Sequence, residues 1–133
     1  MNKQIGLLII SSVLMMADAF SAETILTEKE VQSLFSGNTI KGTYLDIKIP
    51  FESYFDEKGG VYQNRDGENF EGKWFVNKQG KHCIKWQGKD AKCRVVVRNN
   101  DQYLEFLINT KTGKREYLFI INKIIEGNPE GLD

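Results

Sequence analysis

Apolar residues recur along this chain at two spacings, first that of a helix and then that of strands. The segment 31–35 carries a helical stripe, and the capping box Thr27–Glu30 directly precedes it. Gly37 stands where a helix can end in the left-handed conformation. This pattern predicts one short helix over residues 28–36.

From Asn38 onward, apolar and polar residues alternate, and turn-forming residues separate the alternating runs. Because no second helical pattern intervenes, neighbouring strands are expected to pair antiparallel. Pro50 cannot donate to a β-ladder, so it predicts that its strand lies at an edge or carries a bulge. The expected strands cover residues 39–45, 47–55, 61–64, 70–76, 82–86, 92–98, 102–109 and 115–125.

These elements predict a mainly β fold. We expect a seven- to eight-stranded antiparallel meander that forms a small barrel or a sandwich, with one short N-terminal helix.

The N-terminus has the pattern of a secretory signal peptide over residues 1–19. Lys3 precedes an apolar run of roughly 13 residues, which is shorter than the roughly 20 that a membrane-spanning helix needs. The run ends at the small-residue site Ala17-Asp18-Ala19, and cleavage after Ala22 is the alternative. We therefore expect residues 20–133 to form a single β-rich domain that is periplasmic or secreted, without a transmembrane anchor after cleavage.

Two cysteines, Cys83 and Cys93, lie within the expected domain. In an oxidising compartment, an even count at short spacing favours a disulfide between them. Reduced thiols and half of a metal site are the competing interpretations.

Charge is balanced over the whole chain, with 18 basic and 18 acidic residues, but it is unevenly distributed. Residues 73–98 hold eight bases and one acid. A weak anion-binding patch is therefore predicted on this hairpin, against the alternative of a solvated outer face. Its residues are Lys81, Lys85, Lys92, Arg94 and Arg98.

The disulfide and this basic patch conflict in a regular hairpin. Directly opposed residues share a face of a sheet, so pairing Cys83 with Cys93 would put the two basic rows on opposite faces. A β-bulge near Gly88 or at one cysteine would remove the conflict, because one inserted residue shifts the alternation. We predict both the disulfide and the bulge.

A set of ordered motifs resembles one family of bacterial exported proteins, domain of unknown function family 995. Its most specific part is the Gly72-Lys73-Trp74 strand, followed by Cys83-Ile84-Lys85-Trp86 and by Cys93. Lys73 departs from the small residue expected at that position. The resemblance implies a signal-bearing envelope protein of β fold and brings no activity, since the family is uncharacterised.

Other residues that could carry chemistry form no complete motif. His82 is the only histidine, so it is expected to be a half-exposed strand residue rather than a catalytic or metal-binding group. Trp74 and Trp86 are expected in the core, with a ligand cavity as the alternative. Acids that cluster near turns are expected to be solvated; they are Asp56, Glu57, Asp66, Glu68 and Glu71. The sequence thus predicts no catalytic residue, no metal site and no cofactor.

The function that these observations favour is a non-enzymatic binding module. Its expected ligand is an anionic envelope component or a small apolar molecule, and nucleic acid is not expected as a partner. Two alternatives are an inhibitor of a lysozyme-like enzyme and a carboxylate-dependent enzyme that acts on envelope polysaccharide.

Overall fold

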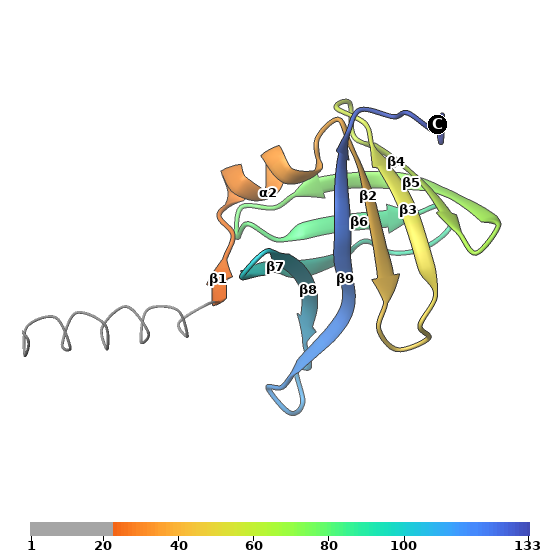
Figure 1. The fold of residues 1–133 in the computed structure, drawn as a ribbon. Coiled ribbons are helices and arrows are strands. Elements are labelled where there is room, and N and C mark those ends of the chain that lie inside the picture. Colours follow the sequence, from red (N-terminus) through yellow and green to blue (C-terminus); the bar gives the residue numbers. More distant parts are fainter. Residues whose placement is uncertain (1–22) are drawn as a thin grey trace, which may run out of the picture.

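The computed structural model describes residues 23–133 and shows a β-barrel with one helix across an end (Figure 1). The predicted signal peptide, residues 1–19, lies outside the described residues. The elements are β1 (Glu23–Ile25), α2 (Glu28–Phe35), β2 (Asn38–Tyr44), β3 (Pro50–Phe55), β4 (Gly60–Arg65), β5 (Glu68–Val76), β6 (His82–Trp86), β7 (Lys92–Asn99), β8 (Gln102–Ile108) and β9 (Arg115–Glu126).

Eight strands, β2 to β9, close the barrel. Each pairs antiparallel with the next along the chain, and β9 returns to pair with β2. The predicted meander is therefore confirmed, and the structure decides for a barrel rather than a sandwich. β1 adds to the edge of β7 as a ninth strand. It was not predicted because three exposed residues carry no alternation.

The helix begins and ends close to where the sequence predicts. Thr27 and Glu30 form the capping box, in which the side chain of each accepts a backbone N–H of the other. The bond from the Thr27 backbone lowers the pKa of Glu30. The buried face of α2, Val31 and Phe35, belongs to the barrel core. The helix lies between β1 and β2 in the chain order and closes one end of the barrel.

Two strand predictions near Pro50 are wrong. β3 lies between β2 and β4, so it is not an edge strand, and it starts at Pro50 rather than at residue 47. Lys48 has a positive φ of 54°, which breaks the extended run before the proline. A proline is tolerated as the first residue of an interior strand.

Bulges occur, but both are on β9. Lys41 pairs with Lys123 and Gly42 with Ile121, which leaves Asn122 as an extra residue. Leu118 is extra in the same way against β8. A bulge increases local twist, which helps a sheet curl and close.

Close backbone packing at Gly72 brings β5 and β6 together. A Cβ at this position would lie 2.4 Å from the carbonyl oxygen of Lys85. The glycine of the Gly72-Lys73-Trp74 motif therefore has a packing role.

Within residues 23–133, no helix is long and apolar enough to cross a membrane.

The predicted cysteine pair is present. The sulfurs of Cys83 and Cys93 lie 2.02 Å apart, at bonding distance. The closed loop spans ten positions, so the bond is expected to contribute about 2–3 kcal/mol to the free energy of unfolding.

Removing this bond tests that contribution. Replacing both cysteines by alanine should lower the free energy of unfolding by about 2–3 kcal/mol in urea titrations. Added reductant should destabilise the natural protein by a similar amount and leave the double variant unchanged. Equal stability of the two proteins without reductant would contradict the prediction.

Candidate functional site

The regular pairing of β6 with β7 decides where the basic residues lie. The register has no shift over three pairs: His82 with Arg94, Cys83 with Cys93, and Ile84 with Lys92. The bulge predicted for this hairpin is therefore wrong.

Without the bulge, the five basic residues do not form one surface. Because Ile84 is in the core and opposed residues share a face, Lys92 and Arg94 start on the inward face of β7. Arg98 is an even number of positions farther along β7, so it falls on the same face of the strand. Lys81 and Lys85 belong to the other face, with the disulfide. The tertiary structure thus separates the predicted patch into two rows.

Arg65 is held among aromatic rings at the barrel end opposite α2, which we call the mouth. Its guanidinium carbon lies 4.8 Å from the ring centre of Tyr44, 4.3 Å from that of Phe70 and 5.9 Å from that of Trp86. Its Nε donates to Oε1 of Gln63 over 2.9 Å. These contacts fix the cation in place and leave the terminal nitrogens as donors.

Arg94 lies over a neighbouring ring, and we call the rings beneath the two arginines the aromatic floor: Tyr44, Phe70, Trp86 and Phe119. Its guanidinium carbon is 5.5 Å from the ring centre of Phe119, and Phe119 contacts the ring of Tyr44 at 5.7 Å. The two arginines therefore rest on neighbouring rings. Both are half-buried, and Nε of Arg94 is buried without a hydrogen-bond partner.

Neither arginine is neutralised by a carboxylate. In the described part of the chain, no ion pair includes Arg65 or Arg94. Glu68 opposes Arg65 in the register of β4 and β5, yet it is exposed and does not pair with it. Two partly desolvated cations without a carboxylate partner produce a positive potential at the mouth.

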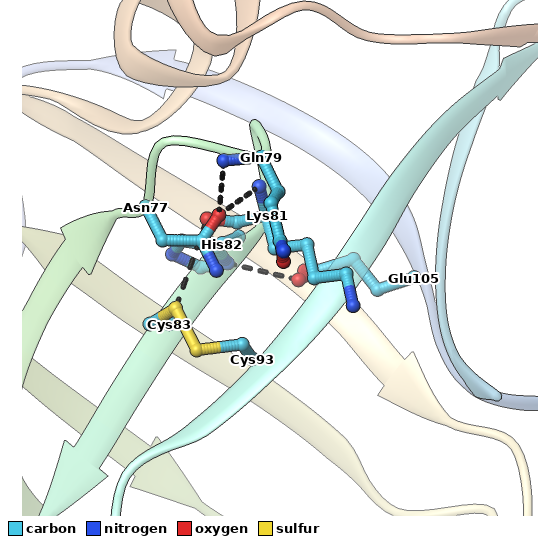
Figure 2. Close-up of a disulfide and its surroundings, with 7 residues drawn as sticks. All are labelled: Asn77, Gln79, Lys81, His82, Cys83, Cys93 and Glu105. Carbon is cyan, nitrogen blue, oxygen red and sulfur yellow. Dashed lines mark hydrogen bonds and ion pairs between the residues drawn. A yellow bond between two sulfur atoms is a disulfide. The ribbon is translucent and has the colours of Figure 1, made fainter. Parts of the chain in front are cut away.

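His82 lies deeper in the barrel and is fully buried, so the prediction of a half-exposed histidine is wrong. Its Nδ1 lies 2.8 Å from Oε1 of Glu105, which is also fully buried (Figure 2). The imidazole stacks on Phe35 of α2, with ring centres 3.8 Å apart. Core side chains enclose this pair, so neither side chain is accessible from solvent.

Large apolar side chains pack together in the barrel interior. Trp74 is buried between Phe35 and Phe55, and its Nε1 donates to the carbonyl oxygen of Asp56. Trp74 is therefore a core residue, as expected. Trp86 is half-buried and lies at the mouth, where it lines a rim hollow of about 300 Å³.

Four of the five acids near turns are exposed, and Asp56 is half-buried. A different carboxyl pair, distant in sequence, was not predicted. Glu52 and Glu130 both contact the ammonium of Lys41, at 3.2 and 3.0 Å. Hydrogen bonding to Glu130, followed by burial, raises the pKa of Glu52, while Glu52 and Lys41 lower the pKa of Glu130. Only the tertiary structure reveals this pair, because the two acids lie on β3 and in the C-terminal tail.

Comparison with models of known protein families finds no match for this chain, and comparison with curated proteins finds none either. The resemblance to domain of unknown function family 995 therefore stays a prediction.

Proposed function

We propose that this protein is a non-enzymatic binding module that holds an anionic component of the bacterial envelope at the barrel mouth. The observation that carries the proposal is the pair of half-buried, unneutralised arginines on one aromatic floor. Burial of a cation without a partner is costly, so a site that keeps two of them gains from an anion. An oxidising envelope compartment agrees with the disulfide.

This location differs from the two that the sequence suggested. The basic hairpin is divided between two faces, and the interior holds packed rings where an apolar ligand would lie. The mouth combines features of both, because cations and aromatic faces meet there. A ligand with a charged group and an apolar body fits that combination.

Binding of inorganic phosphate tests the proposal at its simplest. We expect saturable binding with a Kd in the millimolar range. The titration is monitored through the NMR chemical shifts of the Trp86 indole and the arginine side chains. Arg65→Gln and Arg94→Gln should each weaken binding at least fivefold, since each removes a charge-assisted donor.

Arg98→Gln is the matched control, because it makes the same charge change near the helix end, where Arg98 is exposed. Its phosphate affinity should equal that of the natural protein. If Arg98→Gln weakens binding as much as Arg65→Gln, or if phosphate does not saturate, the mouth is not the site.

A further inference from the structure

A hollow at the rim of the mouth combines three kinds of groups. It has a volume of about 300 Å³, which is at the lower end of the range for small-molecule sites. Aromatic rings come from Phe70 and Trp86, whose centres are 6.3 Å apart. Cations come from Arg65 and Lys89, and further hydrogen-bonding groups come from Asn69, Glu71 and Gln87.

The polar groups of this hollow are available to a ligand. Asn69 uses its side-chain oxygen to accept from the amide of Asn64 over 3.1 Å, which orients the group and leaves its NH₂ as a donor. Gln87 bonds to Glu71 through the backbone only, so the side chains of both keep their capacity for hydrogen bonds. Donors and acceptors thus surround an aromatic wall.

We propose that the ligand at the mouth is an acidic sugar. One face of its ring lies against Trp86, its carboxylate pairs with Arg65, and its hydroxyls bond to Asn69 and Gln87. A pyranose ring has an apolar face of C–H groups that suits an aromatic surface, and hydroxyls at its edge that need both donors and acceptors. This inference rests on the proposed function and names the ligand class for the part of that site beside Arg65, since Arg94 does not line this hollow.

Simpler ligands fit the hollow less well. A wholly apolar molecule would cover the amides and the Glu71 carboxylate without replacing their hydrogen bonds to water, which costs affinity. A small inorganic anion would satisfy Arg65 but leave the Trp86 face unused. Only a ligand with a charge, hydroxyls and an apolar face uses all the groups present.

Calorimetric titration with three probes tests the inference on the natural protein: glucuronate, glucose and acetate. Glucuronate should bind at least tenfold more tightly than either of the others, because only it has both the ring and the charge. Gln87→Ala and Asn69→Ala should weaken glucuronate binding about threefold to tenfold and leave acetate binding unchanged. Gln32→Ala, on the exposed side of α2, is the matched control and should change nothing.

The outcomes separate this inference from the proposed function. If glucuronate and acetate bind equally, and both depend on Arg65, the mouth binds anions but the acidic-sugar inference is wrong. If glucose binds as tightly as glucuronate, the charge does not contribute and the inference is also wrong. If none of the three probes binds and phosphate does not either, the proposed function fails as well.

Trp86→Phe, which keeps an aromatic face, should retain most of the glucuronate affinity, whereas Trp86→Ala should lose it.

Discussion

Replacing Glu105 by alanine is expected to lower the free energy of unfolding by about 3–5 kcal/mol, the cost of removing one partner from a buried, hydrogen-bonded pair of titratable side chains. Both Glu105 and His82 are fully buried, and the 2.8 Å contact between His82 Nδ1 and Glu105 Oε1 is the one side-chain hydrogen bond that each makes among the described residues. Without Glu105, the imidazole has no partner for either nitrogen, because His82 Nε2 is already unpartnered in the barrel. In a domain of this size, such a loss lowers Tm by about 10–20 °C.

Urea titration and calorimetry measure this loss of stability, and three further variants show which interaction causes it. Glu105→Gln keeps a hydrogen-bonding group and should lose only about 1–2 kcal/mol. The double variant His82→Phe with Glu105→Leu removes both polar groups and should recover much of the stability, since packed apolar side chains can replace a buried pair. Glu126→Ala, at an exposed position on β9, should stay within about 0.5 kcal/mol of the natural protein. A loss below about 1 kcal/mol for Glu105→Ala would show that the pair does not stabilise the barrel.

Replacing Phe35 by alanine is expected to cost about 3–5 kcal/mol, because it leaves a cavity where α2 closes the barrel. Phe35 is fully buried and contacts three rings: Phe55 at 5.0 Å, Trp74 at 6.5 Å and His82 at 3.8 Å between centres. The cavity would also deprive the imidazole of its stacking partner. Ser33→Ala, on the exposed side of the same helix, should have little effect.

Two measurements on the Phe35→Ala variant separate an effect on stability from an effect on phosphate binding. Thermal unfolding should show the lower Tm, while phosphate affinity below the transition should match that of the natural protein, because Phe35 lies at the opposite end from Arg65. An unchanged Tm would contradict the closing role of α2. Phe35→Leu, which fills more of the space, should lie between the two proteins.

Local sequence signals predicted most elements because each signal acts on neighbouring residues. The capping box Thr27–Glu30 located the helix to within one residue of its end, and alternation located eight strands. The prediction of an edge strand or a bulge at Pro50 was wrong because its missing N–H matters only where a neighbouring strand needs that donor. That requirement depends on the pairing of β3, which is not a local property.

The candidate site was only partly predictable. Arg94 and Trp86 drew attention through charge and aromatic character, but Arg65 did not, since it is one basic residue in an acidic stretch. Its importance comes from Tyr44, Phe70 and Trp86, which three different strands bring to it. No spacing along the chain indicates such a contact.

By itself, the sequence determined the helix, the antiparallel meander and the pairing of Cys83 with Cys93. Hydrogen bonds, alternation and turns within short segments are sufficient for the first two features, and an even count of two cysteines at short spacing favours the third. Only the tertiary structure decided that the sheet closes, that the basic residues separate, and that His82 is buried against Glu105. Each of these depends on register between strands, because a shift of one residue moves every side chain to the opposite face.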